Sequence, residues 1–119
     1  MRAILTIFIV AIFGVKTGFT QVYAKTNYTP TYAEIIDFYK SLAKKYKQVK
    51  LEEMDETDIG KPLHLFSIKG GESKLKKNKK VRLLINNGIH PGEPDGINAS
   101  MQLADEILSN WKKYQPLFD

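Results

Sequence analysis

Residues 81–85 read Val-Arg-Leu-Leu-Ile, an apolar run broken only by Arg82. Such a run is typical of a strand in the interior of an α/β sheet, where both faces are covered. Residues 86–96 then contain two prolines and three glycines, which predicts a turn-rich loop. Pro94 suits the first position of a helix, and Asp95 lies near the positive end of its dipole. Residues 81–96 are thus predicted to form a strand and a loop, followed by a helix that starts at Pro94. The loop would lie at the C-terminal end of the strand, where open α/β sheets place their active sites.

Two amphipathic helices are predicted on either side of this run. Thr31 and Glu34 fit a capping box, so a helix should run from about Tyr32 to Tyr46. Its apolar residues recur at helical spacing, which indicates core packing: Ile35, Phe38, Tyr39, Leu42 and Tyr46. The same spacing continues after the loop until Pro116, at Ile97, Met101, Ala104, Leu108 and Trp111.

Residues 49–56 and 62–69 predict two antiparallel strands, because turn chemistry at residues 58–61 separates them. Acidic residues crowd the first strand and the turn: Glu52, Glu53, Asp55, Glu56 and Asp58. They lack the ligand spacing and the mid-loop glycine of a calcium-binding loop, so a solvated edge strand is favoured over a calcium site. The order helix, strand, strand, strand, helix suggests a mixed sheet with helices packed on it, although three strands are few for such a sheet.

The amino-acid composition indicates a single globular domain and excludes several kinds of site. With 119 residues, 43% hydrophobic and 26% charged, the chain has room for one globular domain. The absence of Cys excludes disulfides, a thiolate zinc site and a cysteine nucleophile. Beyond residue 24 the chain has 16 basic and 13 acidic residues, a net charge of +3. That charge is too mild to indicate a nucleic-acid partner.

The N-terminus has the three parts of a secretory signal, and we expect cleavage after Ala24. Arg2 is the basic part, residues 3–15 are apolar, and small residues precede the cleavage site in Val22-Tyr23-Ala24. The alternative is a membrane anchor, but 13 apolar residues ended by Lys16 fall short of the roughly 20 that span a bilayer. Residues 1–24 are therefore predicted to be a signal peptide. The remaining 95 residues would be secreted, extracellular or periplasmic, with no stable membrane span.

Five lysines cluster between Gly71 and Lys80, at Lys74, Lys76, Lys77, Lys79 and Lys80. Such a run could bind a polyanion, either nucleic acid or anionic lipid. No aromatic residue interrupts it for base stacking, so a solvated hairpin loop is favoured.

His90 and Glu93 lie three residues apart in the turn-rich loop. An imidazole nitrogen and a carboxylate oxygen are good zinc ligands, and catalytic zinc sites use three protein ligands and a water. Two of the three are visible here. The alternative is a turn in which both side chains are simply exposed to solvent. His64, the other histidine, lies within a predicted strand and is interpreted as structural.

Residues 85–96, with the strand before them and the helix after them, resemble the first zinc-binding segment of the zinc carboxypeptidases, the family like carboxypeptidase A. The match includes an apolar strand, four intervening residues 86–89, and the ligands His90 and Glu93. Its most specific part is the string His-Pro-Gly-Glu-Pro-Asp-Gly, and the resemblance covers roughly residues 29–108.

The resemblance implies an α/β fold, namely the N-terminal part of a mixed-sheet, helix-covered zinc carboxypeptidase-like fold. Its elements would be a helix, a strand hairpin, an interior strand, the metal loop and a helix, so that residues 25–119 form the N-terminal portion of a catalytic domain. Pro91 and Asp95 stand where the better-known animal members have a small and an aliphatic residue. In these two places the chain looks like a divergent bacterial branch.

The implied function is that of a secreted zinc metallocarboxypeptidase that hydrolyses peptide bonds in a peptide or protein substrate. Zinc is the implied cofactor, with His90 and Glu93 as metal ligands. The resemblance places the third ligand, the general base and the residues that bind the substrate carboxylate beyond Asp119, so the fragment alone is expected to be inactive. Two alternatives stay open: a zinc amidase or deacylase of the same fold, and a catalytically inactive secreted binding domain.

Overall fold

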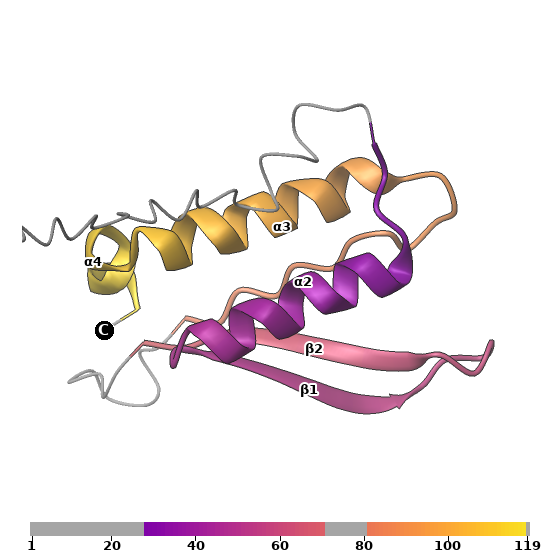
Figure 1. Ribbon diagram of the computed structural model, residues 1–119, viewed down its shortest axis with the longest axis horizontal. Helices are drawn as coiled ribbons and strands as arrows, with labels where there is room; N and C mark the ends of the chain where they lie inside the picture. The colour runs from indigo at the N-terminus through magenta and orange to yellow at the C-terminus, as the bar shows by residue number, and fades with distance from the viewer. Residues whose placement is uncertain (1–27, 71–80, 119) are drawn as a thin grey trace, which may run out of the picture.

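A computed structural model describes residues 28–70 and 81–118 of the chain. These residues form a small α/β arrangement in which two long helices lie beside a two-stranded hairpin (Figure 1). The elements in chain order are α2 (Tyr32–Lys45), β1 (Val49–Glu56), β2 (Pro62–Ile68), α3 (Pro94–Ser109), α4 (Trp111–Tyr114) and the 3-10 helix η2 (Gln115–Leu117).

Helix α2 begins at the predicted capping box. The Thr31 backbone N–H donates to the Glu34 carboxylate at 2.7 Å, and the Glu34 N–H donates to the Thr31 hydroxyl at 3.4 Å. The Tyr28 hydroxyl adds hydrogen bonds of 2.9 Å to both carboxylate oxygens. These bonds favour the charged form and hold the pKa of Glu34 below its usual 4.5, with the Thr31 backbone as the largest cause. The helix ends one residue before the predicted Tyr46, which is extended.

Strands β1 and β2 pair antiparallel, from Val49 opposite Ile68 to Glu56 opposite Pro62. The register shifts between Glu53 and Asp55, which is the signature of a bulge. The connecting turn has Gly60 at φ 69°, a conformation that glycine adopts without strain. The predicted hairpin is therefore confirmed, with β2 one residue shorter than expected.

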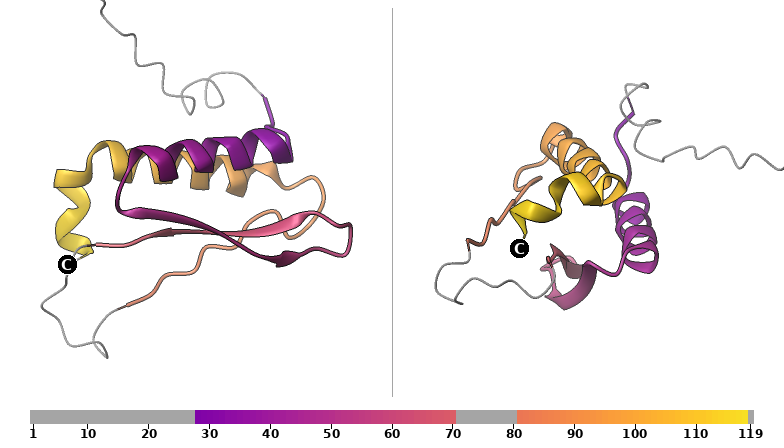
Figure 2. Two further views of the ribbon diagram at one scale, coloured as in Figure 1. Left: turned by 60° about the horizontal axis from the view of Figure 1, so that its bottom comes forward. Right: turned by 90° about the vertical axis from the view of Figure 1, so that its left-hand side faces the viewer.

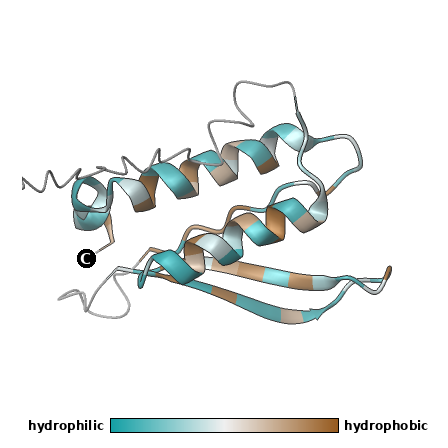
Figure 3. Cartoon of the chain, in the orientation of Figure 1, coloured by the Kyte–Doolittle hydropathy of each residue, from teal (hydrophilic) through white to brown (hydrophobic). Residues whose placement is uncertain are grey.

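The core lies where α2, α3 and the hairpin meet. Figure 2 shows α2 and α3 side by side and running in the same direction, with the hairpin beneath α2. Among the described residues, the buried hydrophobic side chains that form this core come from the two helices: Phe38, Leu42, Met101, Ala104 and Leu108. Tyr39 extends the core toward β2, where its ring lies 4.5 Å from that of Phe66, and burial raises the pKa of Tyr39. Apolar bands on both helices in Figure 3 follow the predicted helical spacing.

The second helix is split at Asn110, whereas the sequence pattern predicted an uninterrupted run to Pro116. Asn110 leaves the helical conformation at φ −110° and ψ 36°. Its side-chain amide donates to the Glu106 carbonyl at 3.2 Å and to the Glu106 carboxylate at 2.9 Å. An asparagine side chain that bonds to the backbone competes with the helix, so α3 ends and the short α4 starts in a new direction.

The prediction of an interior strand at residues 81–85 is wrong for the part of the chain that the structure describes. The segment is extended but belongs to no sheet, and Val81, Leu83 and Leu84 are 93%, 84% and 79% exposed. No backbone hydrogen bond joins it to another described residue, and Figure 2 shows the segment set apart from the hairpin at its residue-81 end. A strand forms only when a neighbour pairs with its N–H and C=O groups. Within the described ranges the sheet has two strands, so the predicted mixed sheet is not formed.

Two sequence predictions fall outside the described residues, namely the signal peptide at residues 1–24 and the lysine-rich segment at 71–80. Among the helices of residues 28–70 and 81–118, none has the length and apolarity needed to cross a membrane.

Candidate metal centre

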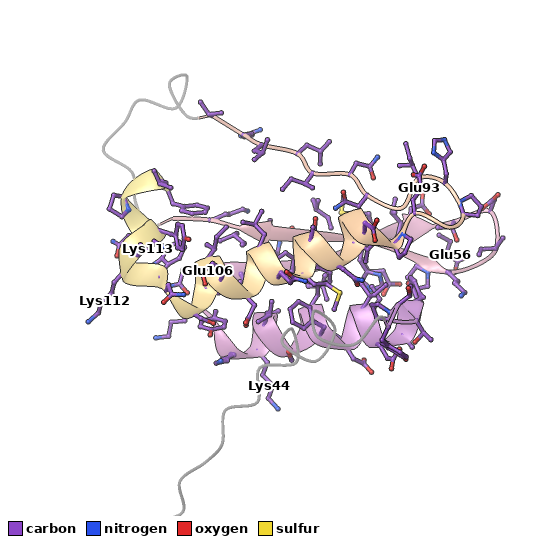
Figure 4. The ribbon with its side chains drawn as sticks, turned by 90° about the horizontal axis from the view of Figure 1, so that it is seen from above. Lys44, Glu56, Glu93, Glu106, Lys112 and Lys113 are labelled. Atoms are coloured by element: carbon purple, nitrogen blue, oxygen red, sulfur yellow. The ribbon has the colours of Figure 1, made fainter. Side chains whose placement is uncertain are left out.

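The predicted metal loop joins the extended segment to α3, at the same end of the molecule as the hairpin turn (Figures 1 and 4). Two glycines give the loop its path, Gly88 at φ 66° and Gly92 at φ 84°. A side chain at either position would be strained. A Cβ atom at position 88 would also lie 2.7 Å from the Cδ1 atom of Ile97, so the loop passes directly over the first turns of α3.

Asn87 fastens the loop to the helix. Its side-chain amide donates a hydrogen bond to the Ser100 hydroxyl. Its carbonyl oxygen lies only 2.8 Å from the place that a Cβ atom on Gly96 would occupy. Gly96 and Ser100 are four residues apart on α3 and so share one face of the helix. Their small size leaves the space in which Asn87 sits.

His90 and Glu93 face each other across the turn that Gly92 makes. The His90 Nδ1 atom lies 3.2 Å from one carboxylate oxygen of Glu93 and 3.3 Å from the other. Both side chains are open to solvent, with 67% and 58% exposed. Glu93 is the N-cap residue of α3, but its carboxylate forms no capping hydrogen bond with the helix. A carboxylate at this position commonly accepts a bond from a helical N–H, whereas here it is directed to the imidazole.

The spacing of the two donor atoms fits a shared zinc ion. At the usual bond lengths of about 2.0–2.2 Å, two ligands of a tetrahedral zinc ion are about 3.4 Å apart. The observed 3.2 Å between the His90 nitrogen and the nearer Glu93 oxygen is a hydrogen-bond distance, and it brings the two atoms close enough together to share one ion. Their exposure leaves room for further ligands. The chemistry of the pair, one imidazole nitrogen and one carboxylate, is also that of zinc sites.

His64 is held elsewhere, in strand β2. The Tyr32 hydroxyl donates to the Pro62 carbonyl at 2.7 Å and lies 3.3 Å from the His64 Nδ1 atom. These contacts tie the start of α2 to the start of β2. In residues 28–70 and 81–118, no group of three or more His, Cys, Asp or Glu side chains comes close enough to hold a metal ion. The structure therefore brings together the two predicted ligands and adds no third to them within those ranges.

The sequence interpretation missed the role of Asn87, which it treated only as one of four residues between strand and ligand. The available signal was the pair of small residues at positions 96 and 100, because two small residues four apart leave an open place on a helix face. Nothing in the sequence said that Asn87 would occupy that place.

Comparison with known proteins gives one match. The model of the zinc carboxypeptidase family matches residues 35–117. The match starts six residues later and ends nine residues later than the resemblance inferred from the motif, and it includes His90 and Glu93. No curated protein matches the chain significantly. Nor does any solved structure.

Proposed function

The chain belongs to the zinc carboxypeptidase family over residues 35–117, and from this premise we propose that it carries two of the three protein ligands of a metallocarboxypeptidase zinc site. His90 and Glu93 are the two zinc ligands in this proposal. The observation that carries it is the 3.2 Å contact between their donor atoms, inside the segment that the family model matches. The proposed reaction is hydrolysis of a peptide bond in a peptide or protein substrate, at the C-terminal residue.

The residues around the ligands hold them in place before a metal arrives. Gly88 and Gly92 turn the loop, and Asn87 fixes it to α3 through Ser100. Pro94, the first residue of α3, then restricts the backbone directly after Glu93. When bound, zinc supplies polarisation of the scissile carbonyl and a water of lowered pKa. Because only two ligands come together in the described residues, we propose that a complete site needs at least one more.

The location of the protein is a further part of the proposal. Residues 1–24 are proposed to direct export and to be removed after Ala24, which leaves residues 25–119 as a portion of a catalytic domain. N-terminal sequencing of protein recovered from outside the cytoplasm should begin at Lys25. A start at Met1 would contradict the cleavage.

The test is calorimetric titration of the chain with zinc. We expect weak binding to the unmodified chain, and a loss of more than about tenfold in affinity in both His90→Ala and Glu93→Ala, since loss of even an outer-sphere contact commonly costs that much. The matched control is His64→Ala, which removes the other histidine and should leave binding unchanged. If His64→Ala weakens binding as much as His90→Ala does, the assignment of the ligands is wrong.

A peptide assay separates the enzyme from the alternatives. The assay uses a protein that also contains the further ligand the proposal requires, since residues 25–119 alone are expected to be inactive. In that protein, release of a free C-terminal amino acid from a peptide, lost in His90→Ala, would show carboxypeptidase activity. Zinc binding without release of any product would favour a scaffold that acts by binding, and cleavage only of an acylated or cell-wall peptide would favour the deacylase or amidase.

A further inference from the structure

A basic pocket is lined by residues next to the open end of the hairpin and by residues of α4 and η2. Figure 1 shows that this end of the molecule lies opposite the metal loop. Its volume is about 540 Å³, within the range of about 300–1,000 Å³ that is usual for small-molecule sites. Three lysines, two glutamines and a tryptophan provide most of its lining: Lys47, Gln48, Lys50, Lys69, Trp111 and Gln115. The zinc ligands lie at the other end of α3, so the pocket does not depend on the proposed metal site.

The charges that surround the pocket are almost all positive. No carboxylate is among the described residues that line it. Lys50 is partly neutralised by Glu52, whose carboxylate lies 2.5 Å from its Nζ atom. Lys47 and Lys69 form no ion pair with any described residue, although the Glu52 carboxylate also interacts with Lys69 at longer range. The two lysines come from different segments, one before β1 and one after β2, and the fold brings them together.

We propose that this pocket binds a small anion that carries several phosphate groups. A lysine ammonium is a compact point charge that binds phosphate oxygens from many directions, whereas flat bidentate recognition of a carboxylate favours arginine. The described lining residues include no arginine. Several separate lysines around one opening therefore suit an anion whose charge is spread over many oxygens. The Gln48 side-chain amide can donate a further hydrogen bond to such oxygens.

The pocket contains its own reporter. Trp111 is the one tryptophan of the 119-residue chain, and it lines the pocket with its ring 5.1 Å from that of Phe118. Because the chain has no other tryptophan, a change in tryptophan fluorescence reports a change in the surroundings of Trp111. It also allows titration at low protein concentration.

The experiment titrates the full chain with inorganic tripolyphosphate and follows Trp111 fluorescence. We expect a saturable change, with affinity about fivefold weaker for each lysine removed and about 25-fold weaker in the double variant Lys47→Gln/Lys69→Gln. The matched control is Lys40→Gln/Lys44→Gln, which removes the same charge from exposed positions on α2 and should change affinity by less than about twofold. The absence of a saturable change, or equal losses in the two double variants, would overturn the proposal.

Two further arms identify the ligand chemistry. Citrate, a carboxylate anion of similar charge, should bind at least about tenfold more weakly than tripolyphosphate, and equal affinity would overturn the phosphate assignment. Adenosine triphosphate should bind at least as tightly as tripolyphosphate, because it carries the same three phosphate groups. Tighter binding of the nucleotide than of tripolyphosphate would indicate that the adenine base contacts Trp111. Failure of the nucleotide to bind would contradict a site for phosphorylated small molecules.

Iodide quenching tests the local charge without a ligand. Iodide should quench Trp111 more strongly than neutral acrylamide does, relative to free tryptophan, because the lysines attract the anion. This excess should fall in Lys47→Gln/Lys69→Gln and persist in Lys40→Gln/Lys44→Gln. No excess in the unmodified chain would show that the pocket is not positive.

Discussion

Asn87 links the position of the proposed metal ligands, His90 and Glu93, to the identity of two small residues on α3. Its carbonyl oxygen occupies the space beside Gly96, and its amide donates to Ser100. Gly96 is the third residue of α3, and glycine in a helix costs up to about 1 kcal/mol relative to alanine, so alanine would suit the helix at least as well at this position. The glycine therefore makes sense as the residue that lets Asn87 hold the loop.

The variant Gly96→Ala tests whether zinc affinity can be lowered without a loss in the free energy of unfolding. We expect the free energy of unfolding to stay the same or rise by up to about 1 kcal/mol, because alanine favours the helix and the clashing atom is the end of a movable side chain. Zinc affinity should nevertheless fall by about tenfold, since the displaced Asn87 no longer fixes the loop. Asn87→Ala should weaken zinc binding to a similar degree. Unchanged zinc binding in both variants, measured by calorimetry, would show that the ligands position themselves without this anchor.

At the scale of elements, local patterns predicted the helices and the hairpin and failed where pairing was required. The capping box of α2, the turn at Gly60 and the start of α3 at Pro94 depend on residues a few positions apart, so the sequence contains their causes. The segment 81–85 was predicted from its apolar character alone. Whether such a segment becomes a strand depends on a partner from elsewhere in the chain, and its sequence does not contain that information.

The same distinction applies to the candidate site. The contact between His90 and Glu93 follows from a spacing of three residues and a glycine turn, so the sequence could predict it. The anchor at Asn87 joins residues 13 positions apart through a side-chain bond. The basic pocket joins three segments of the chain, and neither of these arrangements could be read from a local pattern.

The cap of α2 predicts how stability depends on pH. Hydrogen bonds from Thr31 and Tyr28 lower the pKa of Glu34 in the folded chain, whereas in the unfolded chain it should be near 4.5. A depressed folded-state pKa contributes stability above pH 4.5 that is lost as the pH falls through the lower, folded value. Stability measured by urea unfolding should therefore decline below pH 4.5. In Glu34→Gln this part of the decline should disappear, and an identical pH profile in both proteins would contradict the assignment.

On the scale of the whole molecule, the small core stabilises the folded monomer, whereas the exposed apolar segment 81–85 favours association with other chains. Five buried side chains form the core in the described residues, and at about 1.5–3 kcal/mol for each large one they give modest stabilisation. Meanwhile Val81, Leu83 and Leu84 present their side chains to water, on an extended backbone that forms no backbone hydrogen bond with another described residue. Figure 3 shows apolar colour along this segment. An exposed apolar segment of this kind, extended and unpaired within the described residues, is a template for pairing with other chains.

We therefore predict that the chain from Lys25 onward associates as its concentration rises, and that residues 81–85 cause the association. Leu83→Lys/Leu84→Lys should reduce light scattering strongly at equal concentration, because charge on an edge blocks pairing. The control variant Leu103→Lys/Leu117→Lys places the same charges at two exposed leucines outside the segment, 45% and 81% exposed, and should reduce scattering much less. A sharp, reversible thermal transition in a monomer of the unmodified chain would contradict the prediction. Such a transition would mean that the core keeps the chain folded and monomeric despite the exposed apolar segment 81–85.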